Sequence, residues 1–173
     1  MSHVPPQTVK QLADFFRYHP TWIEAARPVK DGSNSEVFFA GFTQPYHLMR
    51  QNGESRLLEG AAPSPDFSFI FPTSVVADFA ALGQDAEVAD FAIMLFDHIQ
   101  SQDDAKRIGF RVVGSITQIL WRGYLQVLLK GGGRVLQYAA AHGVRNLNDF
   151  SRLLRNLRGK DVDWTRFKED NAS

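Results

Sequence analysis

The histidine, aspartate and serine side chains that could perform acid–base or nucleophilic chemistry are scattered along this chain. Asp97 and His98 form the one adjacent acid–histidine pair. Neighbouring helix positions point about 100° apart, so this pair cannot act as a base and the carboxylate that orients it. The five histidines never show the His-x-x-x-His spacing of two metal ligands on one helix face. No serine lies in a Gly-x-Ser-x-Gly elbow. The sequence therefore predicts no catalytic residue and no metal site.

Single carboxylates and a glycine run complete the candidate chemistry. Asp66, Asp78 and Asp90 stand near the ends of expected strands or helices, where an aspartate side chain usually bonds to the backbone of a turn or cap. The Gly131-Gly-Gly run lacks the Lys-Ser/Thr and the preceding strand of a phosphate-binding loop, so a structural hinge is expected. We therefore expect no cofactor. An enzyme that uses one isolated acid in a pocket remains an alternative, for which the sequence names no residue.

Composition narrows the class of protein. A chain of 173 residues suits one domain, and 19 basic residues balance 19 acidic ones, so no bulk charge attracts nucleic acid. There is no cysteine, which excludes disulfides and thiolate chemistry. No apolar run approaches the roughly 18 residues of a membrane-spanning helix, and the first residues do not have the pattern of a secretory signal. These features favour a cytoplasmic location.

The first part of the chain combines helical and strand patterns. Apolar residues recur every three or four positions in residues 6–18, which predicts an amphipathic helix, followed by a short helical turn at 21–26. A turn-rich loop then leads into a strand at 36–42. Strands at 46–50 and 55–59 flank Asn-Gly, the dipeptide most typical of a two-residue hairpin.

Three phenylalanines alternate in residues 66–71, which predicts a strand with all three on one side. A hydroxyl of Thr73 or Ser74 is expected to cap the next helix, which Gly83 ends. Asp85 is expected to open a longer helix that is apolar around most of its circumference. A helix of this kind is buried on most sides or faces a bound ligand.

The remaining elements are a strand and three helices. Residues 108–113 alternate as a strand. Residues 116–129 are apolar at helical spacing, with continuation of the strand as the alternative. A short helix at 135–141 precedes a last helix at 148–158 that Asn148 can cap.

The last helix has two contrasting faces. Its apolar face consists of Phe150, Leu153, Leu154 and Leu157. Its basic face consists of Arg152, Arg155 and Arg158, with Arg145 and Lys160 nearby. A basic amphipathic helix can lie on a membrane surface, and the same pattern also suits the solvated side of a packed helix. Both interpretations stay open, so transient contact with a membrane surface is one of the partner hypotheses.

Three segments carry a family resemblance. Residues 46–60 form a hairpin with an aromatic-led strand, an Asn-Gly turn and a closing Glu-Gly. Residues 65–83 form a strand that runs into a helix with a Phe-x-x-Leu ending, and residues 106–115 form a later strand followed by glycine. In this order they resemble the lipid-binding domain of the sterol carrier protein (type two) family. The resemblance covers residues 37–129, about half of the chain.

The resemblance implies an α+β fold, in which helices cover one face of a five-stranded, mostly antiparallel sheet. Between sheet and helices, the family holds a fatty acyl chain, a sterol or another lipid in an apolar tunnel. This chain departs from the family in its extra terminal helices. We therefore divide it into an N-terminal helical segment (1–35), a sterol-carrier-like core (36–130) and a C-terminal helical extension (131–173), all within one compact domain.

These observations lead to two functional hypotheses. The first is non-catalytic binding and carriage of a hydrophobic ligand, such as a fatty acyl chain, a sterol-like molecule or an isoprenoid lipid. The second is an accessory or scaffold protein that presents a hydrophobic intermediate to partner enzymes in quinone or isoprenoid lipid synthesis. The expected partners are a lipid or another hydrophobic small molecule, together with proteins under the second hypothesis. The expected ligand-lining residues are Phe67, Phe69, Phe71, Phe79, Leu82, Phe91, Met94, Leu95, Phe110, Val112 and Leu120.

Overall fold

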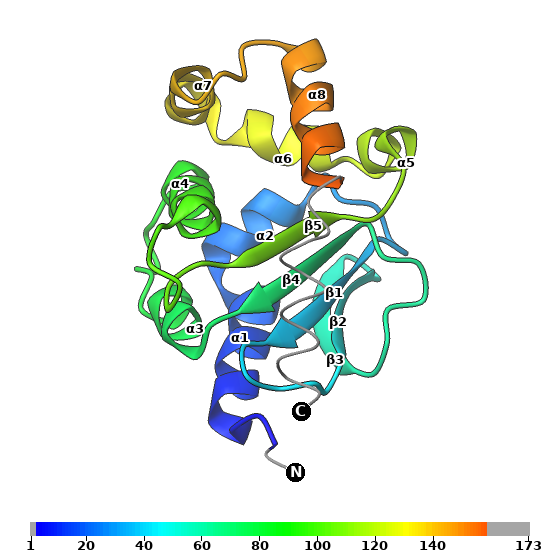
Figure 1. Ribbon diagram of the computed structural model, residues 1–173, viewed down its shortest axis with the longest axis vertical. Coiled ribbons are helices and arrows are strands. Elements are labelled where there is room, and N and C mark those ends of the chain that lie inside the picture. Colours follow the sequence, from blue (N-terminus) through cyan, green and yellow to red (C-terminus); the bar gives the residue numbers. More distant parts are fainter. Residues whose placement is uncertain (1–2, 159–173) are drawn as a thin grey trace.

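The computed structural model describes residues 3–158, which fold into five strands and eight helices (Figure 1). The strands form one sheet in the order β3-β2-β1-β4-β5. Their bounds are β1 Asn34–Phe39, β2 Tyr46–Gln51, β3 Glu54–Glu59, β4 Phe67–Phe71 and β5 Gly109–Val112. Strands β1 and β4 pair in parallel, whereas the other three neighbouring pairs are antiparallel. This arrangement confirms the α+β class and the mostly antiparallel five-stranded sheet.

The β2–β3 hairpin follows directly from its turn residues. Asn52 has φ 52° and Gly53 has φ 74°, so both central residues adopt the left-handed conformation that a type I′ turn requires. The turn sets the register of the hairpin, in which Tyr46 pairs with Glu59. The first strand begins two residues earlier than expected, because Asn34 and Ser35 already pair with β2.

Strand register places most of the large apolar residues on the sheet face that packs against helices. Val37 pairs with Tyr46 on one side and with Phe69 on the other, and Phe69 pairs with Phe110. Residues that pair in this way share one side of a sheet, so the alternation expected for β4 is confirmed. Helices α1, α3 and α4 contribute to the same apolar cluster as these strands. The helices that pack on this face lie behind the strands and beside them in Figure 1.

The two N-terminal helices match the sequence pattern closely. Helix α1 (Pro6–Tyr18) has the expected bounds, and it buries Leu12, Phe15 and Phe16 in the main apolar cluster. Helix α2 (Pro20–Ala26) begins at a proline whose fixed φ suits a first helical position. The ring of His19 accepts a hydrogen bond from the Thr21 N–H and so caps α2.

The expected caps of the two middle helices are wrong. Helix α3 (Thr73–Ala80) begins after Pro72 and, in the described part of the chain, has no side-chain cap, because Ser74 Oγ donates to the Ala105 carbonyl at 2.8 Å instead. Helix α3 also ends three residues before Gly83. Helix α4 (Val88–Gln100) begins three residues after Asp85, where Glu87 and Asp90 form a reciprocal capping box.

The helix expected at 116–129 is two helices. Helix α5 (Ile116–Trp121) and helix α6 (Tyr124–Lys130) are separated by Gly123, which has φ 92°. A Cβ at this position would lie 2.2 Å from the Pro28 carbonyl oxygen. The break therefore follows from close packing of Gly123 against the segment after α2.

Two further helices complete the described chain. Helix α7 (Gly132–Ala141) begins inside the glycine run, and Gly143 follows it with φ 86°. Helix α8 (Leu147–Arg158) is capped by Asn146 rather than Asn148, since Asn146 Oδ1 accepts from the Asp149 N–H at 3.0 Å. Helix α8 lies along β5, where Phe150 and Leu154 join a second apolar cluster with Phe67 and Val112.

Candidate functional site

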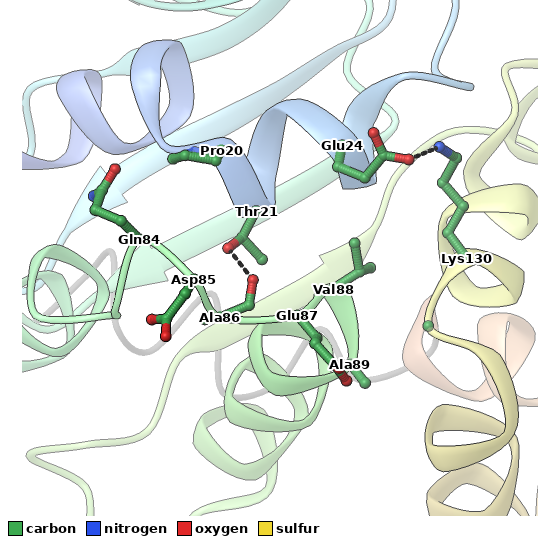
Figure 2. Close-up of a pocket in the computed structure, with 11 residues that line it drawn as sticks. Pro20, Thr21, Glu24, Gln84, Asp85, Ala86, Glu87, Val88, Ala89 and Lys130 are labelled. Atoms are coloured by element: carbon green, nitrogen blue, oxygen red, sulfur yellow. Dashed lines mark hydrogen bonds and ion pairs between the residues drawn. The ribbon is translucent and has the colours of Figure 1, made fainter.

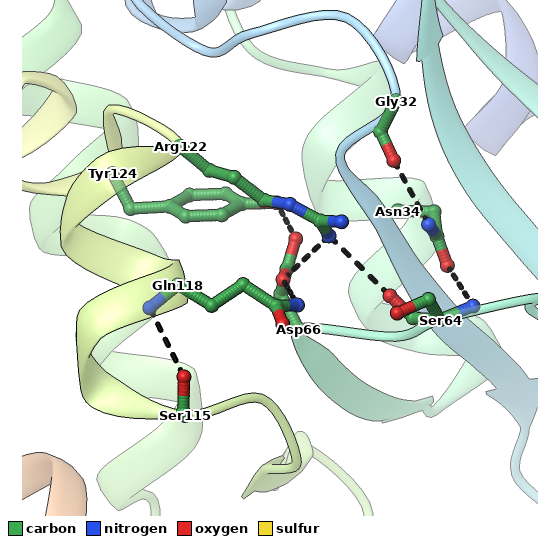
Figure 3. A network of polar contacts seen from close by, with 8 residues as sticks. All are labelled: Gly32, Asn34, Ser64, Asp66, Ser115, Gln118, Arg122 and Tyr124. Atoms are coloured by element: carbon green, nitrogen blue, oxygen red, sulfur yellow. Dashed lines mark hydrogen bonds and ion pairs between the residues drawn. The ribbon is translucent and has the colours of Figure 1, made fainter.

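A fully buried carboxylate connects the start of β4 to helices α5 and α6 (Figure 3). One oxygen of Asp66 accepts from Gln118 Nε2 at 2.6 Å and from Arg122 Nη1 at 2.7 Å, and the other accepts from the Tyr124 hydroxyl at 2.8 Å. Val113 N–H donates to the Asp66 backbone oxygen. The turn or cap role expected for this side chain is therefore wrong. Asp66 is instead the acceptor at the centre of a buried network.

Sequence reasoning missed this network because its members are more than 50 positions from Asp66 along the chain. One signal was present, since Gln118 and Arg122 are four residues apart and such residues share a helix face. That spacing indicates a polar helix side but not its buried partner. The network holds β4 against α5 and α6. Its member Tyr124 also packs on Phe67, on the side of the sheet that faces the helices.

Tyr124 links the network to serines at the start of β1. Burial, together with the charge and hydrogen bond of Asp66, raises the pKa of Tyr124 far above its usual range, and Ser35 and Ser33 partly oppose this rise. Both serines are almost fully buried. Ser33 Oγ nevertheless makes no hydrogen bond of normal geometry to any residue between 3 and 158. Ser33 therefore contacts Tyr124, but the two hydroxyl groups are not aligned for a well-formed hydrogen bond.

Ser33, Arg50 and Ser55 lie side by side across three neighbouring segments of the sheet. The Arg50 N–H donates to the Ser33 carbonyl at 2.8 Å, and Arg50 pairs in register with Ser55. Arg50 Nη1 also donates to Ser55 Oγ at 3.2 Å, while Arg50 Nε has no partner among the described residues. Burial lowers the pKa of Arg50, and the charge of Asp31 opposes that effect. We call Ser33, Arg50 and Ser55 the polar row.

The eleven residues expected to line a ligand site fall into two apolar clusters that meet at Phe69. The first cluster contains Phe71, Phe79, Leu82, Phe91, Met94 and Leu95, and the second contains Phe67, Phe110, Val112 and Leu120. Phe69 packs against both. The structure thus places these residues in one continuous apolar layer between the sheet and the helices. Their role as a ligand lining stays a prediction.

Phe69 and Phe110 have an unusual environment for their positions in the sheet. Phe69 lies on the interior strand β4 and on the side that faces the helices, yet both residues keep part of their surface accessible. Their rings lie 5.2 Å apart, and the Phe69 ring stacks on Phe71 with centroids 5.6 Å apart. The helices therefore cover the middle of this aromatic surface incompletely.

Two shallow grooves lie outside this layer. One, of about 400 Å³, runs between α2, the start of α4 and the α6–α7 junction (Figure 2), where Lys130 Nζ binds Glu24 at 2.6 Å and Thr21 donates to the Ala86 carbonyl. That ion pair lowers the pKa of Glu24. The other, of about 380 Å³, lies beside α4 and includes Met94 in its lining. Of the expected lining residues, the first groove contains none and the second contains Met94.

The other candidate residues have structural partners. Asp97 accepts from the Tyr138 hydroxyl, whereas His98 Nε2 lies 3.3 Å from Asp78, so the adjacent acid and histidine point to different elements. Within residues 3–158, no group of three histidine or acidic side chains is arranged to hold a metal ion. The same residues include no helix that is both long and apolar enough to cross a membrane.

The basic face of the last helix is partly described. Arg152 pairs with Asp149 at 3.1 Å, and Arg155 Nε donates to the Ser151 carbonyl. The side chains of Leu157 and Arg158, together with Lys160, lie outside the described residues. Of the apolar face, Phe150 and Leu154 are buried and Leu153 is partly buried.

Comparison with known proteins gives one structural likeness. No family model and no curated protein sequence matches the chain. A solved structure named UbiJ-SCP2 Ubiquinone synthesis protein is similar, with a TM-score of 0.40 and 17% sequence identity over 74% of this chain and 96% of that one.

Proposed function

We propose that this chain binds a hydrophobic ligand, such as a fatty acyl chain, a sterol-like molecule or an isoprenoid lipid, in the layer between its sheet and helices, without catalysing a reaction. The observation that carries the proposal is the accessible aromatic surface of Phe69 and Phe110. Aromatic side chains on the helix-facing side of a sheet are normally closed off by packing, because burying each stabilises the fold by roughly 1.5–3 kcal/mol. Apolar surface left accessible in this position suits an apolar ligand.

The chemistry of the layer supports binding rather than catalysis. Its members are aromatic and aliphatic, so they supply contact area but no proton donor or nucleophile. Two titratable groups beside the layer, Asp66 and Tyr124, bond to each other, and the Tyr124 ring packs on Phe67. Their hydrogen bonds are used to hold α5 and α6 on the sheet. The cytoplasmic location and the division into an N-terminal segment, a core and a C-terminal extension remain part of this proposal.

The second candidate function, presentation of a hydrophobic intermediate to a partner enzyme, is favoured by exposed apolar side chains on the C-terminal helices. Trp121 on α5 is 67% exposed, Leu129 on α6 is 52% exposed and Leu136 on α7 is 51% exposed. Exposed apolar groups of this size can contact another protein. Recovery of a stable enzyme complex from native extract would favour presentation over free carriage.

Displacement of a fluorescent fatty acid tests the proposed function. The purified protein should take up the probe and release it to unlabelled lipid, and native mass spectrometry should detect copurified ligand. Phe110→Asp places a charge in the aromatic layer at the edge strand β5, so it should abolish uptake of the probe. Leu58→Asp is the matched control, because Leu58 lies on the opposite edge strand β3 and is 38% exposed.

Circular dichroism should show that both variants stay folded. If Phe110→Asp unfolds, Phe110→Trp provides a second test, since the larger ring fills the accessible space and should compete with the ligand. Unchanged uptake by folded Phe110 variants, or equal loss in Leu58→Asp, would contradict the proposed site.

A further inference from the structure

The helix-facing surface of the sheet changes from polar to apolar along the strands. The polar row crosses one end of this surface, with Ser33 beside the first residue of β1. Val37 lies four residues further along β1 and pairs with Phe69. Phe69 and Phe110 form the accessible aromatic part of the apolar layer, called here the aromatic layer. Four residues of extended strand span about 13 Å. A ligand lying along the strands would therefore have its tail on the aromatic layer and its head at the polar row.

Two side chains at this end have donors that lack well-formed hydrogen bonds. Among residues 3–158, Arg50 Nε has no partner, and the Ser33 hydroxyl, which is 2% exposed, contacts Tyr124 without a well-formed hydrogen bond. Arg50 Nη1 donates to Ser55 Oγ at 3.2 Å, so this guanidinium lies along the polar row. The guanidinium N–H groups can only donate. Since burying such groups unpaired costs free energy, the group that complements them is rich in acceptors.

The charged groups at this end are two cations, Arg50 and Arg122, and two anions, Asp66 and Asp31, and of the two cations Arg122 is the one that forms an ion pair within residues 3–158. Asp66 already accepts from three side chains, including the cation Arg122. Asp31 influences Arg50 through its charge, but its Oδ1 accepts from the Gly53 N–H. Arg50 forms no ion pair with any residue in the described part of the chain. An anion at this end could therefore pair with Arg50, the cation that has no ion-pair partner among the described residues, and accept from its N–H groups.

We infer that the polar row binds the oxyanion head, a carboxylate or a phosphate, of an amphipathic ligand whose apolar tail lies on the aromatic layer. This inference rests on the proposed function and adds the chemical class of the ligand. Arg50 supplies the charge and a directed N–H donor, and the Ser33 hydroxyl supplies a second donor. Charge-assisted hydrogen bonds of this kind are stronger than neutral ones, so the head decides which of several equally apolar ligands binds.

Binding of palmitic acid, its methyl ester and hexadecyl phosphate, each measured by displacement of a neutral fluorescent lipid, tests the inference. The acid should bind about tenfold more tightly than the ester, the factor expected from roughly one charge-assisted hydrogen bond. Inorganic phosphate alone should not displace the probe. Arg50→Gln should remove the preference for the acid and leave the affinity for the ester unchanged.

Arg56→Gln is the matched control, because Arg56 is an exposed arginine of β3 that pairs with Glu54, and it should keep the preference. Ser33→Ala is a second variant that tests the inference if Arg50→Gln fails to fold. This change should weaken acid binding with little loss of stability, because the buried Ser33 hydroxyl makes no well-formed hydrogen bond in the described part of the chain. Equal binding of acid and ester, or a preference that survives in Arg50→Gln, would overturn the inference alone. Binding of neither ligand would overturn the proposed function itself.

Discussion

Replacing Asp66 by asparagine tests whether the buried network holds the C-terminal helices on the sheet. Asparagine keeps the shape of the side chain and one oxygen acceptor, but it removes the negative charge opposite Arg122, whose side chain is 17% exposed. Removing one partner of a buried ion pair costs about 3–5 kcal/mol, because the remaining charge stays buried without compensation. Domains of this size unfold with about 5–15 kcal/mol, so the change should remove a large share of the stability.

Chemical and thermal unfolding measure this effect. A change of 1 kcal/mol lowers Tm by about 2–4 °C in a domain of 150–250 residues, so Asp66→Asn should lower Tm by about 6–20 °C. Urea unfolding followed by circular dichroism should show the same loss as a lower midpoint with an unchanged slope. Asp104→Asn is the control, since Asp104 pairs with Arg107 at the surface and is 89% exposed. Surface pairs of this kind contribute little.

A double-variant cycle identifies the cause of the loss. If the uncompensated charge of Arg122 is responsible, Asp66→Asn combined with Arg122→Gln should cost less than the sum of the two single changes. Strict additivity, or an Asp66→Asn variant as stable as Asp104→Asn, would refute the account of this network.

Two further predictions concern the backbone and a tyrosine. Gly123→Ala should destabilise the protein more than Gly132→Ala, although both glycines have positive φ. The new Cβ at Gly123 would lie 2.2 Å from the Pro28 carbonyl oxygen, whereas the new Cβ at Gly132 would have no atom within 4 Å. Equal urea midpoints for the two variants would contradict this. Burial and Asp97 raise the pKa of Tyr138 to about 12, so absorbance near pH 12 should report its ionisation, and Asp97→Asn should lower that pKa. Because the folded state favours the protonated phenol, this stabilisation is complete below the unfolded pKa, near pH 10, and is lost as pH rises towards 12.

Local patterns predicted the elements whose limits are set by their own residues. Helix α1 has its expected bounds because Pro6 begins it and Pro20 follows it. The hairpin has its expected turn because Asn52 and Gly53 accept positive φ. Alternation placed the three phenylalanines of β4 on one face, since side chains in a strand point to opposite sides in turn.

Contacts between distant segments account for what the sequence did not predict. Helix α5 ends before Gly123 because Pro28, almost a hundred residues earlier, packs against that glycine. The role of Asp66 depends on three side chains from another segment, so no local pattern shows it. Alternation near the strand ends predicts which side chains are buried. It does not predict that Ser33 Oγ and Arg50 Nε lack well-formed hydrogen bonds within residues 3–158, because that depends on how the helices pack.

The mixed order of the sheet has a consequence for folding kinetics. The β2–β3 ladder closes at Gln51 and Glu54, so the hairpin can form with little loss of chain entropy. The parallel β1–β4 ladder instead joins Ser35 to Phe67 and can form only after the whole intervening hairpin has been looped out. Non-local pairings of this kind slow folding. We therefore expect pairing of β1 with β4 to be the slow step of sheet formation. The same pairing joins Ser33, which precedes β1, and Arg50 on β2 to the strands that carry Phe69 and Phe110.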